Sequence, residues 1–133
     1  LAESNIRRVA MGDPDAVPAG VYARQFLQVS GLWNEIRDKV VPMRNVRAVL
    51  AAVEAGNADA GFVYRTDVRL VENIKIAVAI PVGKGPEILY VAAVTTNGPN
   101  ESGARQLLDF LRSEAATQIF EGYGFITLND GVP

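Results

Sequence analysis

The first part of the chain alternates between short apolar runs and segments with helical spacing. Residues 6–11 form a strand-like run that ends in a Gly-Asp-Pro turn. The segment 19–29 then carries apolar side chains at i, i+4 and i+7, which predicts a helix with a buried face. The residues of that predicted face are Tyr22, Phe26 and Val29. The chain is therefore expected to open with a strand followed by a helix.

A second strand and helix are predicted after a short helical segment at residues 33–39. Residues 40–43 are extended, because Pro42 is incompatible with a helix interior and restricts the residue before it. Asn45 is a favourable N-cap and Gly56 a favourable end for the helix that follows. The expected apolar face of this helix consists of Val46, Val49, Leu50 and Val53.

Three further strands are expected in the rest of the chain. They are residues 60–64, 74–80 and 88–95. Within the last of them, residues 89–94 are continuously apolar, as in a strand that is buried on both faces. Strands that alternate with helices favour an α/β fold with a mostly parallel sheet.

Three further helices complete the predicted pattern. One short helix is capped by Thr66 or Asp67 and ends near Val71, a second is capped by Ser102, and a third covers residues 114–121. In the third helix the residues expected to face inward are Ala116, Ile119 and Phe120.

Composition excludes several classes of function. The chain has 133 residues and a net charge of −2, which argues against a nucleic-acid partner or an anionic membrane surface. It contains neither cysteine nor histidine, so disulfides, zinc sites of ordinary composition and a histidine-dependent catalytic triad are excluded. No pair of carboxylates is placed for acid–base chemistry, and no cofactor site is recognisable. An enzyme is therefore not expected.

Two predicted helix starts and one tyrosine form a candidate anion site. Ala19 follows Pro18 at the start of its helix, and Val46 follows the Asn45 cap, so each amide N–H lies where helices leave donors unpaired. Tyr64 is expected at the carboxyl end of its strand, where its hydroxyl could donate to the same ligand. Taken singly, each feature is also explained by an ordinary helix entry or by a packed tyrosine.

The charged residues near these positions have simpler explanations. Arg44, Arg47 and Arg65 are expected to be surface charges that do not bind an anion. The carboxylates Asp13, Asp15 and Asp67 are expected to serve turns and caps. The Gly-Lys-Gly sequence at residues 83–85 joins two predicted strands and lacks the Ser or Thr of a phosphate loop.

Three segments carry a resemblance to a known family. They read VAMGDPDAVPAGVYARQFL at residues 9–27, NVRAVLAAVEAGNADAGFVYRTD at residues 45–67, and AATQIFEGYGF at residues 115–125. These strings resemble the periplasmic molybdate-binding proteins of bacterial ABC transporters, and the similarity runs nearly from end to end. The GDP-x-x-VPAG-x-YA string is quite specific to that family.

The resemblance implies a type II periplasmic-binding-protein fold, in which two α/β lobes flank a cleft. Residues 1–87 would be most of the second lobe. Residues 88–133 would be the crossover strand and carboxy-terminal helices that belong to the first lobe in the intact family. The rest of the first lobe, with its serine-bearing loops, would be absent from this chain.

The resemblance also implies a function and a set of site residues. The molybdate or tungstate oxyanion would be held by the amides of Ala19 and Val46 and by the Tyr64 hydroxyl. A membrane permease would be the partner, and the location would be the periplasm or a lipid anchor outside the cytoplasmic membrane. The alternative is the effector-sensing domain of a transcription regulator with the same fold. Sheet edges and apolar faces left uncovered by the missing lobe would also favour dimerisation, through those edges or through exchange of the carboxy-terminal helices.

Overall fold

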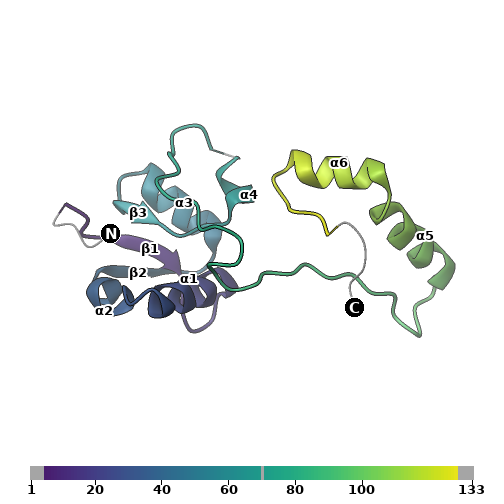
Figure 1. The fold of residues 1–133 in the computed structure, drawn as a ribbon, viewed down its shortest axis with the longest axis horizontal. Coiled ribbons are helices and arrows are strands. Elements are labelled where there is room, and N and C mark those ends of the chain that lie inside the picture. The colour runs from purple at the N-terminus through teal and green to yellow at the C-terminus, as the bar shows by residue number, and fades with distance from the viewer. Residues whose placement is uncertain (1–4, 70, 129–133) are drawn as a thin grey trace. The chain divides into compact units, whose positions relative to one another are not determined.

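The computed structural model describes residues 5–69 and 71–128 (Figure 1). The chain divides into two compact units, Leu1–Glu87 and Ile88–Pro133. The first unit contains a sheet with helices on both faces. The second unit contains a helix pair and the extended segments beside it.

The sheet of the first unit has three parallel strands. They are β1 (Val9–Gly12), β2 (Val40–Met43) and β3 (Ala60–Gly61). Their order is β2-β1-β3, and Val9 is paired with Val40 on one side and with Ala60 on the other. The predicted parallel α/β arrangement is therefore confirmed for this unit.

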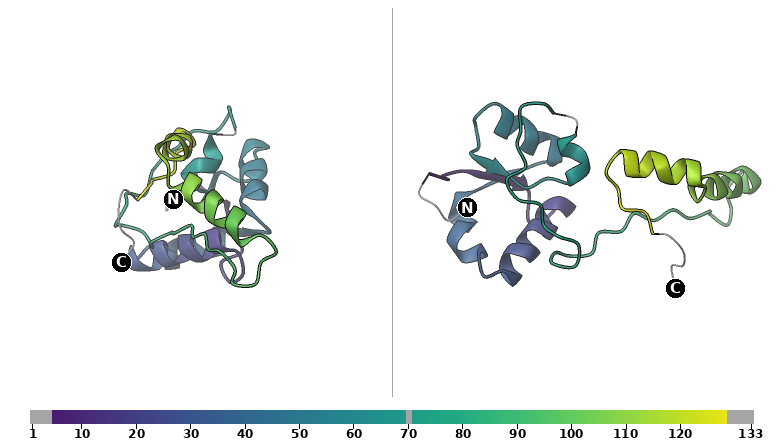
Figure 2. Two further views of the ribbon diagram at one scale, coloured as in Figure 1. Left: turned by 90° about the vertical axis from the view of Figure 1, so that its right-hand side faces the viewer. Right: turned by 45° about the horizontal axis from the view of Figure 1, so that its top comes forward.

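A helix follows each strand of the sheet. These helices are α1 (Pro18–Val29), α3 (Val46–Glu54) and α4 (Arg65–Val68). Between α1 and β2 lie the short helix α2 (Trp33–Ile36) and the 3-10 turn η1 (Arg37–Lys39). Figures 1 and 2 show α1 and α3 on opposite faces of the sheet. Because the strands are parallel, all three strand-to-helix junctions lie at the same edge of the sheet.

The central strand β1 is buried along its whole length and supplies both halves of the core. One cluster lies on the α1 and α2 side and consists of Val9, Met11, Ala23, Leu27 and Ile36. The other lies on the α3 side and consists of Ala10, Val49, Ala52 and Ala58. Successive side chains of a strand point to opposite faces, so one short strand anchors helices on both sides.

The buried face of α1 differs from the predicted one. Val29 is 87% exposed, so its assignment to the core was wrong. The helix instead packs through Ala19, Ala23 and Leu27, which recur at i, i+4 and i+8. Small residues in this stripe let the helix lie close to the sheet, so Tyr22 and Phe26 are left only half-buried at its margin.

Two predicted caps are displaced in the structure. The short helix α4 begins at Arg65 with Tyr64 as its N-cap, so Thr66 and Asp67 lie inside it and β3 ends at Gly61. In α5 (Glu101–Leu111) the cap is Asn100 instead of Ser102, because the Asn100 side-chain oxygen accepts from the Gly103 amide at 2.9 Å. By contrast, the Asn45 cap of α3 was predicted correctly.

The predicted strands at residues 74–80 and 88–95 are absent from the described part of the chain. Val78 and Val91 are 80% and 90% exposed, so the expectation that residues 89–94 are buried on both faces was wrong. An apolar run becomes a strand only where another strand satisfies its N–H and C=O groups. No strand of the described residues pairs with either run.

The second unit is built around α5 and α6 (Glu114–Gly122). Phe125 makes edge-to-face ring contacts with Tyr90 and Phe120, at centroid separations of 5.5 and 5.9 Å. Ala116 is buried as predicted, whereas Ile119 is 54% exposed and was wrongly expected to face inward. The described part of the second unit has only α5 and the extended segments to pack against α6, so one side of α6 stays exposed.

Candidate functional site

The candidate site is the edge of the sheet where β1, β2 and β3 end and their helices begin. The first residue of the loop after β1, Asp13, donates its amide to the Met43 carbonyl at the end of β2, over 2.8 Å. This bond ties the first junction directly to the second. The sites predicted at Ala19, Val46 and Tyr64 belong to the three junctions in turn.

Ala19 lies in the first turn of α1, which lacks a side-chain cap. The N-cap Val17 is extended, and its carbonyl accepts from the amides of Gly20 and Val21 at 2.9 and 3.0 Å. Pro18 has no amide hydrogen. Within the described residues no acceptor is found for the Ala19 amide, so this N–H remains available at the positive end of the helix dipole.

Val46 is the first residue of α3. The Asn45 side chain accepts from the Ala48 amide at 2.9 Å, and the Asn45 carbonyl accepts from Val49 at 3.3 Å. Within the described part of the chain, the Val46 amide donates to no acceptor. The Val46 side chain is half-buried.

Tyr64 is placed at the third junction as the N-cap of α4, beyond the end of its strand. The backbone is extended there, with φ −75° and ψ 150°, and the Tyr64 carbonyl accepts from the Asp67 amide at 3.1 Å. Its side chain is half-buried. The topology therefore brings all three predicted residues to one edge of one sheet.

Two glycines allow α1 to lie close to the end of β1. A Cβ atom added to Gly20 would lie 1.9 Å from the carbonyl oxygen of Gly12, and one added to Gly12 would lie 2.6 Å from Val17. No other residue permits this approach without movement of the backbone. The position of the start of α1, where the Ala19 amide lies, therefore depends on glycine at both sites.

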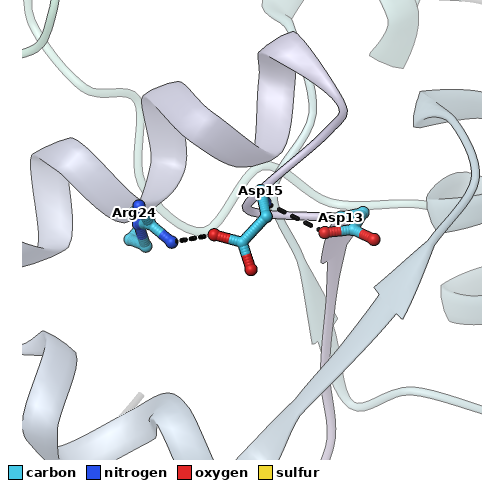
Figure 3. Close-up of polar contacts among 3 residues, drawn as sticks. All are labelled: Asp13, Asp15 and Arg24. Carbon is cyan, nitrogen blue, oxygen red and sulfur yellow. Dashed lines mark hydrogen bonds and ion pairs between the residues drawn. The ribbon is translucent and has the colours of Figure 1, made fainter.

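The prediction that carboxylates serve the turn before α1 is confirmed for Asp13 but not for Asp15. Asp13 accepts from the Asp15 amide at 2.9 Å through a side-chain oxygen, and its carbonyl accepts from Val17 at 2.8 Å. Asp15 in turn forms an ion pair with Arg24 of α1 (Figure 3). Arg24 was missed by the sequence reasoning, since charges nine residues apart have no regular spacing that would reveal a pair.

The other cations near this edge are exposed, in agreement with the prediction that they are surface charges. Arg44 precedes the α3 cap, Arg47 lies in the first turn of α3, and Arg65 is the first residue of α4. Among the residues that the structure describes, no cluster of His, Cys, Asp and Glu could hold a metal ion. Nor does any helix in that part have the length and apolar character needed to cross a bilayer.

Comparison with protein families defines the class to which this arrangement belongs. The model of the bacterial extracellular solute-binding proteins matches residues 1–126, and the chain belongs to that family. A putative ABC transporter substrate-binding lipoprotein of Bacillus subtilis, YvgL, is 36% identical over 94% of this chain and 47% of its own length. The molybdate-binding protein ModA of Escherichia coli is 36% identical over 89% of the chain and 46% of its own.

The fold agrees with that assignment. The substrate-binding domain of a putative molybdenum ABC transporter from Clostridium difficile matches 96% of this chain and 56% of its own, with a TM-score of 0.84 and 33% identity. The predicted fold class is therefore correct. This chain spans about half the length of the curated relatives that it matches. YvgL is named as a substrate-binding lipoprotein of an ABC transporter, and ModA is named as a molybdate-binding protein.

Proposed function

We propose that this chain belongs to the solute-binding component of an ABC importer for molybdate or tungstate. The oxyanion would accept hydrogen bonds from the amides of Ala19 and Val46 and from the Tyr64 hydroxyl. The observation that carries this proposal is the convergence of three strand-to-helix junctions on one sheet edge. At two of these junctions an amide, that of Ala19 or that of Val46, donates to no acceptor within the described residues. The names of the relatives supply the identity of the anion.

The chemistry of the proposed donors suits a fully deprotonated oxyanion. Molybdate and tungstate offer only hydrogen-bond acceptors at neutral pH, so a site made of donors alone satisfies them. Hydrogen phosphate carries a proton that would need an acceptor, and sulfate would have to be rejected by its smaller size. The ends of α1 and α3 each supply roughly half an elementary charge, so no cationic ligand is required.

We further propose that the two parts of the chain belong to different lobes of the parent protein. Residues 1–87 would be most of the second lobe, and residues 88–133 would be the crossover segment and helices of the first. The donors of the first lobe would then come from sequence outside this chain. On its own the chain would bind the anion more weakly than a protein with both lobes.

The proposed partners and location follow from the same function. The loaded protein would deliver the anion to the membrane permease of the importer, outside the cytoplasmic membrane. Molybdate or tungstate would be the transported ligand and not a cofactor, and no enzymatic turnover is expected. The exposed apolar side chains of both units would favour dimerisation of the isolated chain.

Calorimetric titration with molybdate, tungstate, sulfate and phosphate tests the proposal. The protein encoded by the whole gene should bind the first two tightly and the last two weakly, and this chain should bind all four weakly. Tyr64→Phe should lower molybdate affinity roughly tenfold or more, as expected for a lost hydrogen bond to a charged group. Tyr123→Phe removes a hydroxyl from an exposed side chain of the second unit and is the matched control. Equal affinities for all four anions would contradict the proposal.

A further inference from the structure

Negative charge lies immediately before the helix that would bind the anion. Asp13 and Asp15 are in the loop between β1 and α1, and no acidic residue occupies the first turn of the helix itself. A carboxylate close to a helix N-terminus is stabilised by the helix dipole. It therefore opposes a dianion that binds the same end.

Arg24 is placed to cancel one of these charges. It lies in the second turn of α1, and side chains on a helix lean back toward its N-terminus. Its guanidinium Nη1 contacts the Asp15 carboxylate directly, while the Asp15 amide donates to Asp13 at 2.9 Å (Figure 3). The Arg24 side chain is 34% exposed and that of Asp15 is 78% exposed.

We infer that Arg24 is a positioning residue for the anion site, which neutralises Asp15 and keeps that carboxylate from repelling a dianion at the start of α1. This inference rests on the proposed function. A pair this exposed adds little to stability, so its main effect falls on the charge that a ligand meets at the sheet edge.

Two single variants and their double variant separate charge compensation from a purely structural role. Sodium molybdate is titrated into the protein encoded by the whole gene at low ionic strength. Arg24→Gln should weaken binding about fivefold, because a dianion then meets an additional uncompensated charge. Asp15→Asn should not weaken binding, and Asp15→Asn with Arg24→Gln should restore affinity to about the wild-type value. At high salt the loss in Arg24→Gln should shrink, since the added charge is screened.

A matched control breaks an ion pair far along the chain. Arg105→Gln removes the contact between Arg105 and Glu101 on α5, which spans 2.6 Å, and should leave molybdate affinity unchanged. If the pair acted only as a structural tie, Asp15→Asn would weaken binding as much as Arg24→Gln, and the double variant would not recover. That result, or an unaffected Arg24→Gln, would overturn this inference alone. Failure of the wild-type protein to bind molybdate would overturn the proposed function and the inference with it.

Discussion

At the scale of single residues, the tightest packing near the candidate site is between Gly12 and Gly20. A methyl group at Gly20 would overlap the Gly12 carbonyl, so Gly20→Ala must push α1 away from β1. We expect a loss of stability of about 1–3 kcal/mol, typical of overpacking. Chemical denaturation measures this loss.

Gly122→Ala is the matched control for that substitution. Gly122 also lies in a helix, but a Cβ atom added there meets nothing within 4 Å. Alanine is the better helix former, so stability should be unchanged or rise by up to about 1 kcal/mol. Equal losses in the two variants would show that the close approach of Gly20 to Gly12 does not matter.

Individual contacts of this kind were the least predictable part of the molecule. The GDP-x-x-VPAG-x-YA sequence, which contains both glycines, was recognised from its resemblance to a family. The amides of Ala19 and Val46 were predicted as candidate anion donors from the helix starts alone. The distance between Gly12 and Gly20, and the pairing of Asp15 with Arg24, depend on how α1 lies against the sheet. Sequence spacing carries no information about that approach.

At the scale of elements, helices were easier to predict than strands. The Asn45 cap and the start of α3 follow from local hydrogen bonding, which the sequence determines directly. The predicted strands at residues 74–80 and 88–95 failed because a strand depends on partner strands distant in the sequence. The same dependence shortened β3 to Ala60–Gly61.

The link between the segment before β1 and the loop before β3 should make the free energy of unfolding depend on pH. One Asp59 side-chain oxygen accepts from the amides of Arg7 and Arg8, both at 2.8 Å. These hydrogen bonds, more than the nearby arginine charges, hold the pKa of Asp59 below its ordinary value of 3.8. A lowered pKa in the folded state means that the stabilisation is complete above about pH 4 and is lost as the pH falls through the folded pKa.

The variant Asp59→Asn tests this link. It should lower the midpoint of urea denaturation at pH 7, and the difference from the wild type should shrink as the pH falls below 3.8. Asp38→Asn is a suitable control, because its carboxylate lies at the surface in a loose pair with Arg37 at 3.7 Å. A difference at Asp59 that stays constant from pH 7 to pH 3 would contradict the assignment.

The two asparagine caps form a second matched pair. Asn45 caps α3 and Asn100 caps α5, each by accepting from an amide three residues later at 2.9 Å. Replacing either with alanine should cost about 1 kcal/mol of stability. Only Asn45→Ala should also weaken molybdate binding, since it loosens the start of α3, where the Val46 amide lies. Calorimetry on both variants would contradict the site if Asn100→Ala had the larger effect on affinity.

At the scale of the whole molecule, exposed apolar surface is the dominant feature outside the sheet. Leu107, Phe110 and Ile119 on the two helices of the second unit are each more than half exposed. Surfaces of this kind favour association. We expect light scattering to find a dimer of the isolated chain at micromolar concentration. A strictly monomeric species would contradict this expectation.

In the proposed function, an oxyanion binds at the amides where α1 and α3 begin. The most direct measurement is the amide chemical shift of each residue of this chain as sodium molybdate is added. We expect the largest shifts at Ala19 and Val46, with smaller ones near Tyr64 and none at Gly103 or Ala116 in the second unit. Saturating shifts elsewhere, or none at Ala19 and Val46 while another part of the chain responds, would contradict it.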